Sequence, residues 1–121
     1  MGNGRAVSIG DIHWVQLPTA DGREQRGRRP AVILQDEQYA GGLPVILVVP
    51  LTTTQAALRF AGTTRIQPST KNGLRQVSVA LVFQLRAIDR QRVEERIGSV
   101  SRAVLNEIFA ELDKLTGRTA G

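Results

Sequence analysis

A short run of arginines between two apolar segments holds the side chains best suited to chemistry in this chain. The run spans residues 22–30 and reads Gly-Arg-Glu-Gln-Arg-Gly-Arg-Arg-Pro. The apolar residues Ile12, Trp14, Val15 and Leu17 precede it, and the apolar run 31–34 follows it. Each guanidinium stays charged and can form paired hydrogen bonds to phosphate oxygens. The run is therefore typical of a phosphate-handling loop between two core strands, although a solvated basic hairpin tip would have the same composition.

The remaining reactive side chains exclude several kinds of chemistry. The chain has no cysteine and a single histidine, His13. It therefore offers no thiolate nucleophile, no ordinary zinc site and no pair of histidines for general acid–base catalysis within one chain. We expect no metal and no cofactor. For His13, which lies on a predicted strand, we expect a surface position or a structural hydrogen bond.

Charge and length narrow the class of protein. The chain has 121 residues, which suits one domain, and a formal net charge of +5. Arginine supplies 14 of the 16 basic residues, which favours a polyanionic partner: nucleic acid, an anionic membrane or an acidic protein. The longest apolar run, 45–51, is too short to span a bilayer. With no apolar leader segment either, we expect a soluble cytoplasmic protein.

Short apolar segments separated by turn residues predict a small β-rich domain. A later change to helical spacing predicts an amphipathic helix between Ser101, a good N-cap, and Gly117, a good C′ residue. Asn72-Gly73 is the strongest turn signal. The predicted fold class is mostly β (α+β), a small antiparallel barrel with a C-terminal amphipathic helix. We expect strands over residues 9–17, 31–35, 45–52, 63–67 (at an edge), 77–85 and 93–100.

The order of the motifs resembles that of the MazF/PemK toxin family. Residues 10–15 are similar to the opening G-D-(I/V)-x-(W/F)-(V/A) of that family, and residues 22–30 to its G-x-E-Q-x-G-x-R-P. Residues 50–53 resemble its strand-ending P-(L/V/C)-T, and residues 84–89 its Q-(I/V)-R-(T/S)-I-D. The resemblance covers residues 9–116 of what we read as one domain, 1–121.

The resemblance implies an SH3-like barrel, a homodimer and the toxin role in a type II toxin–antitoxin system. It implies sequence-specific, metal-independent cleavage of single-stranded RNA, including mRNA, which leaves 2′,3′-cyclic phosphate and 5′-hydroxyl ends. It also implies inhibition by a cognate MazE-like antitoxin. In this reaction the RNA supplies its own nucleophile, so the protein has only to move protons and stabilise charge on the phosphate.

The resemblance also assigns roles to residues. Arg29 corresponds to the central catalytic arginine, as charge stabiliser and proton-transfer group, and Thr52 to its threonine partner. Because arginine is nearly always protonated, the stabilising role is the one we favour. With aromatic residues at 4% of the chain, we expect RNA capture by polar contacts more than by base stacking. We predict contacts to phosphates from Arg23, Arg26 and Arg28, and contacts to base edges from Glu24, Gln25 and Gln84. The other predicted substrate-binding residues are Thr53 and Arg86. For Arg86, a buried pair with Asp89 is the alternative.

Two questions stay open at the level of sequence. In the Kid/PemK branch of the family a loop histidine, a strand aspartate and an arginine take part in the chemistry. Arg23, Phe83 and Leu81 stand at those positions here, so that mechanism does not transfer and the general base is not identified. Two other functions are also compatible with such a barrel: a CcdB-like gyrase poison without nuclease activity, and a simple RNA-binding module.

Overall fold

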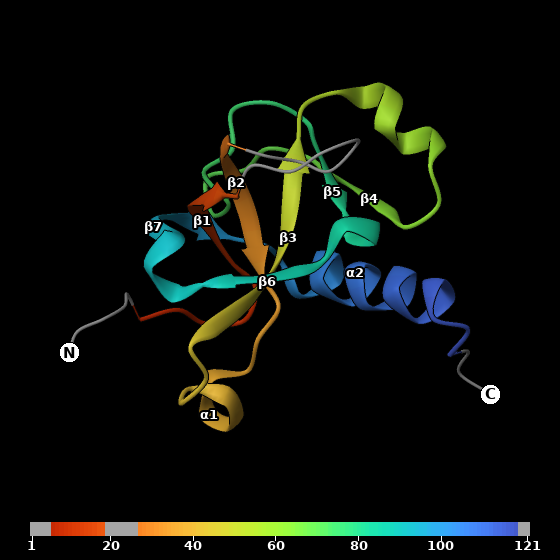
Figure 1. The fold of residues 1–121 in the computed structure, drawn as a ribbon. Coiled ribbons are helices and arrows are strands. Elements are labelled where there is room, and N and C mark those ends of the chain that lie inside the picture. The colour runs from red at the N-terminus through yellow and green to blue at the C-terminus, as the bar shows by residue number, and fades with distance from the viewer. Residues whose placement is uncertain (1–5, 19–26, 119–121) are drawn as a thin grey trace.

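The computed structural model describes residues 6–18 and 27–118, in which a bent antiparallel sheet packs against one long helix (Figure 1). Short helical turns connect several of the strands. The elements are β1 Asp11–Leu17, β2 Gly27–Ile33, α1 Glu37–Ala40, β3 Val45–Thr52, η1 Gln55–Arg59, β4 Thr63–Ile66, β5 Ser78–Leu81, η2 Val82–Gln84, β6 Arg86–Asp89, η3 Arg90–Arg92, β7 Val93–Ser99 and α2 Arg102–Leu115.

The seven strands form one sheet in the order β4-β5-β3-β2-β1-β7, and β6 also pairs with β3. This confirms the predicted class of antiparallel β-fold with a C-terminal helix, and it places β4 at an edge as expected. Along the described residues the order ends in β4 and β7, so the sheet is barrel-like and open. β2 begins at Gly27, so the prediction that residues 27–30 belong to a loop was wrong.

β3 organises the sheet because three strands pair with it. β2 lies along one edge, with Ala31 opposite Pro50. Along the other edge, β6 pairs with residues 45–48 and β5 with residues 51–52. The prediction of a single strand over 77–85 was therefore wrong, because the turn η2 divides that segment into β5 and β6.

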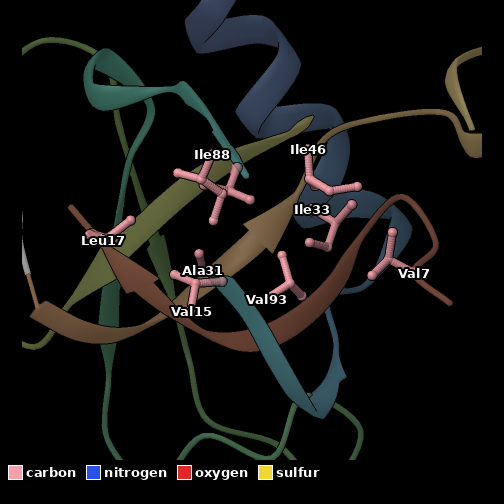
Figure 2. Packing of buried hydrophobic residues seen from close by; sticks show 9 residues of the cluster. Val7, Val15, Leu17, Ala31, Ile33, Ile46, Ile88 and Val93 are labelled. Carbon is pink, nitrogen blue, oxygen red and sulfur yellow. The ribbon is translucent and has the colours of Figure 1, made fainter. Parts of the chain in front are cut away.

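One hydrophobic core lies on the face of the sheet shared by β1, β2, β3 and β6 (Figure 2). Residues two apart on β1, β2 and β3 point into it, as the two-residue period of a strand requires, and β6 and β7 each add one residue. Val15, Ala31, Ile33 and Val48 are fully buried there. The cluster comprises Val7, Val15, Leu17, Ala31, Ile33, Ile46, Val48, Ile88 and Val93.

A second core lies on the opposite face and is covered by α2. Ile108 of α2 is fully buried in it, and Leu105 and Leu112 pack at its border. The predicted caps are confirmed. Ser101 accepts a hydrogen bond from the Val104 N–H, and Gly117 has a φ of +75°. No helix within the described residues is long and apolar enough to cross a membrane.

Candidate functional site

Arg29 and Thr52 lie on adjacent strands at the same end of the sheet. Arg29 is opposite Val15 of β1, on the central strand β2. Figure 1 shows the start of β2 beside the end of β3. The β2–β3 register, continued by two residues beyond Ala31 and Pro50, places Arg29 opposite Thr52. Opposed residues of an antiparallel pair point to the same face, so the sheet brings the two predicted catalytic side chains together.

The hydroxyl of Thr52 is held in place and lies beside a cavity. Thr52 is buried, and its Oγ1 accepts a hydrogen bond from the Thr54 N–H at 3.2 Å. Thr52 and Gln84 line the same cavity, of about 350 Å³, which we call the Gln84 cavity. Gln84 comes from η2, between β5 and β6. The structure therefore brings together two predicted site residues that are far apart in the sequence.

An exposed aromatic pair borders the Gln84 cavity, and neither ring was predicted from the sequence to contact the substrate. The rings of Phe60 and Phe83 lie 5.8 Å apart at 60°. The guanidinium of Arg59 lies 4.9 Å from the ring centre of Phe60. Two of the five aromatic residues thus lie where a base could stack. The available signal was Phe60, an aromatic residue in the segment that connects β3 and β4.

Arg28 has intramolecular partners in this structure. Its Nε lies 2.7 Å from Glu94 Oε1, and its Nη2 lies 3.1 Å from Glu95 Oε2. The same guanidinium lies over the ring of Trp14, 4.3 Å from its centre. The hydrogen bond that Arg28 donates to Glu94 raises the pKa of Arg28 above its usual value. Contact between Arg28 and an RNA phosphate stays a prediction, and it would require exchange of these carboxylate partners.

His13 has the structural role that was expected of it. Its ring is buried in β1, and Nδ1 donates to the Glu94 carbonyl at 2.8 Å. Arg86 is half-buried at the start of β6, opposite Val48. Asp89, the partner considered for Arg86, is exposed and accepts a hydrogen bond from the Gln91 N–H.

Several predicted contacts lie outside the described part of the chain. They are Arg23, Glu24, Gln25 and Arg26. Thr53 is exposed and lines a second cavity, on the other side of the end of β3. Across residues 6–18 and 27–118, no three histidine, aspartate or glutamate side chains gather closely enough to hold a metal ion.

Comparison with known proteins finds relatives over almost the whole chain. The sequence model of a family described as PemK-like, MazF-like toxin of type II toxin-antitoxin system matches residues 8–116. The Endoribonuclease toxin MazF of Escherichia coli strain K12 is 32% identical over 110 residues, which cover 90% of this chain and 93% of that protein. Endoribonuclease MazF of Staphylococcus epidermidis is 29% identical over 107 residues, 88% of each chain. The crystal structure of MazF (Form-I) from Deinococcus radiodurans superposes with a TM-score of 0.78 at 25% identity, covering 93% of this chain and 98% of that one.

Proposed function

The chain belongs to the PemK-like, MazF-like toxin family of type II toxin–antitoxin systems, and from this membership we propose that it cuts single-stranded RNA at specific sequences. A cognate MazE-like antitoxin holds it silent, and it acts in the cytoplasm on mRNA. The observation that carries the proposal is the convergence of Arg29, Thr52 and Gln84 at one end of the sheet, from three separate segments.

The reaction is a transfer within the RNA. The 2′-hydroxyl attacks the adjacent phosphorus, the bond to the 5′-oxygen breaks, and the products are a 2′,3′-cyclic phosphate and a 5′-hydroxyl. One proton leaves the 2′-oxygen and one joins the 5′-oxygen. Negative charge builds up on the phosphoryl oxygens in between, and fixed donors aimed at that charge lower the barrier.

Arg29 supplies the charge for this step and Thr52 a hydrogen bond. The guanidinium can bond two phosphoryl oxygens at once, which a lysine ammonium cannot do with the same geometry. Arg29 is paired with Val15 of β1, and two residues further along the strand Ala31 is paired with Pro50 of β3, so the sheet fixes the Arg29 backbone. Gln84 and the exposed rings of Phe60 and Phe83 face the adjacent cavity, where they can contact an unstacked base.

The protein acts as a homodimer in this proposal. Exposed apolar side chains on η1 and α2 support it, because a monomer rarely leaves a group of large apolar side chains in water. Leu115 of α2 lies against Gly62, in the segment that follows η1. The exposed group comprises Leu58, Phe109 and Leu115. Sedimentation of the purified protein tests this part.

The test of the function is incubation of a mixed RNA pool with the protein in EDTA, followed by mapping of the cut ends. We expect cuts at a short recurring sequence, with a 5′-hydroxyl and a cyclic phosphate at each cut. The same sequence as DNA should stay intact, because DNA lacks the attacking 2′-hydroxyl. An interaction protein that acts on gyrase, or a plain RNA-binding module, would leave the RNA uncut and would overturn the proposal.

A further inference from the structure

A second cavity lies on the other side of the end of β3, and the proposed function does not use it. Thr52 lines the Gln84 cavity, whereas the next residue, Thr53, lines this one. Its volume is about 480 Å³, within the range of about 300–1,000 Å³ that small-molecule sites occupy. Trp14 and Pro30, neighbours across β1 and β2, also line it. We call it the Trp14 cavity.

The charges of the Trp14 cavity suit an anion. Arg75 and Arg96 line it, and no acidic residue is among the described residues of its lining. Arg75 is exposed and forms no ion pair with any residue in the described ranges. The side chain of Arg96 is 54% exposed and has only Asp11, at 3.4 Å, as an ionic partner there. Both guanidinium groups can therefore turn toward a bound phosphate.

The loop that carries Arg75 is held in place by the rest of the fold. Buried Asn72 fastens it: its Oδ1 accepts from the N–H groups of Ser69 and Leu74, both at 2.9 Å, and its Nδ2 donates to the Gln67 carbonyl at 2.8 Å. Gly73, with φ +69°, lies so close to β7 that an added Cβ would be 2.5 Å from the Ile97 oxygen. A fixed loop keeps the cavity formed before any ligand arrives, which lowers the cost of binding.

We propose that the Trp14 cavity binds a nucleotide of the RNA on one side of the cleaved bond. Arg75 and Arg96 hold a phosphate, and the base lies against the apolar surface of Trp14 and Leu74. An RNA strand whose cleaved phosphate lies at Thr52 would pass Thr53 next and so enter this cavity. A basic groove with an aromatic surface is the usual combination for single-stranded nucleic acid. This proposal rests on the proposed function, because it extends the path of the same substrate.

The test uses the cut sequence mapped in EDTA, made uncleavable by a 2′-deoxy nucleotide at the cut. Three RNAs are compared: the minimal sequence, and the same sequence lengthened by a few nucleotides on the 5′ side only or the 3′ side only. We expect the wild-type protein to bind one of the lengthened RNAs more tightly than the minimal one. The Arg75→Gln/Arg96→Gln double variant should lose this gain, by about tenfold, the equivalent of roughly 1.4 kcal/mol. For the double variant on that RNA, the slope of the logarithm of the binding constant against the logarithm of the salt concentration should also be shallower, by roughly 0.7 per lost phosphate contact.

Arg65→Gln/Arg102→Gln is the matched control, because it also removes two positive charges, from exposed sites that line neither cavity. It should retain the gain. Trp14 gives a second readout as the only tryptophan in the chain: its fluorescence should change with the favoured lengthened RNA and not with the minimal one. The proposal would be overturned if the two lengthened RNAs gained affinity equally, or if neither gained any. It would also be overturned if the gain in affinity survived in the Arg75→Gln/Arg96→Gln double variant. If the wild-type protein cuts no RNA at all, the proposed function itself fails, and the two failures are thus distinguishable.

Discussion

The guanidinium of Arg28 lies over the ring of Trp14, 4.3 Å from its centre, and Glu94 and Glu95 hold it there. On the surface formed by β1, β2 and β7, the positive charge of Arg28 is therefore already neutralised by neighbouring carboxylates. RNA must compete with two carboxylates for Arg28, whereas Arg75, in the loop between β4 and β5, has no such competitor among the described residues. The arginines of this protein are therefore unequal as phosphate partners.

Glu94→Gln should tighten RNA binding by a few-fold. The substitution removes the stronger carboxylate partner of Arg28 and leaves the guanidinium available for phosphate. Glu107→Gln on the exposed face of α2 is the control, because it changes the net charge equally at a distant site. Fluorescence anisotropy with an uncleavable RNA measures both. Equal tightening by the two variants would mean that only overall charge matters and that Arg28 does not contact RNA.

Arg29→Ala should reduce the cleavage rate by about 100-fold or more, because one donor to the transition-state charge is lost. Arg29→Lys should also be poor, since a point charge does not reproduce the paired hydrogen bonds. The control is Arg65→Ala, which removes an exposed arginine from the edge strand β4. Single-turnover cleavage and thermal unfolding are measured together. A folded Arg29→Ala protein that cuts at nearly the wild-type rate would reject the assignment.

Thr52→Val should reduce cleavage strongly while the shape of the buried side chain is kept. It should also lower the free energy of unfolding by about 1 kcal/mol, because the Thr54 N–H loses the Oγ1 acceptor. Thr52→Ser retains that hydroxyl and should recover much of both losses. A structural role alone would give the same loss of stability with unchanged activity per folded molecule.

Glu37→Gln should destabilise the protein near neutral pH and have little effect in acid. Arg90 donates to both carboxylate oxygens of Glu37, at 2.7 and 3.0 Å, and these hydrogen bonds lower the pKa of Glu37 below 4.5. The stabilisation is therefore fully present above about pH 4.5 and is lost as the pH falls through the lowered value. We expect a loss of about 1 kcal/mol at pH 7.

Urea unfolding at neutral and acidic pH measures this difference. Glu111→Gln, which breaks the exposed pair with Lys114, is the matched control and should cost less at every pH. A Glu37→Gln penalty that persists unchanged below the pKa of Glu37 would show that the ion pair is not its cause.

Elements whose ends are marked by local chemistry could be predicted from the sequence. Ser101 accepts the Val104 N–H at the start of α2, and at its end Gly117 and Arg118 donate to the carbonyls of Lys114 and Asp113. These contacts involve residues three to five positions apart, so the sequence contains both partners of each. Asn72-Gly73 was likewise recognisable, because the left-handed φ of Gly73 is a local requirement.

Residues 77–85 are divided into β5 and β6 by their pairing with a strand that is distant in the sequence. The alternation of residues within 77–85 does not contain that information, so a single strand was predicted. β5 and β6 pair with different ends of β3, on either side of Pro50. Pro50 has no N–H to donate to a ladder, and the chain opposite it turns at η2. The proline was visible in the sequence, but its effect on another segment was not.

The candidate site was predictable only where a motif marked it. Arg29, Thr52 and Gln84 lie in segments with family motifs, and the structure places all three at one end of the sheet. Phe60 and Arg75 lie in connecting segments that carry no motif. Their positions beside the cavities follow from how those segments fold back on β3 and β7, which is tertiary information.

Arg29 extends from an interior strand, and this affects how the protein should behave on heating. A side chain on a loop can lose its position by local opening, well before the domain unfolds. At Arg29 β2 is paired with β1, and from Ala31 onward it is paired with both β1 and β3, so this backbone leaves its place only when the sheet itself separates. The temperature at which Arg29 stops working and the temperature at which the whole domain melts should therefore coincide.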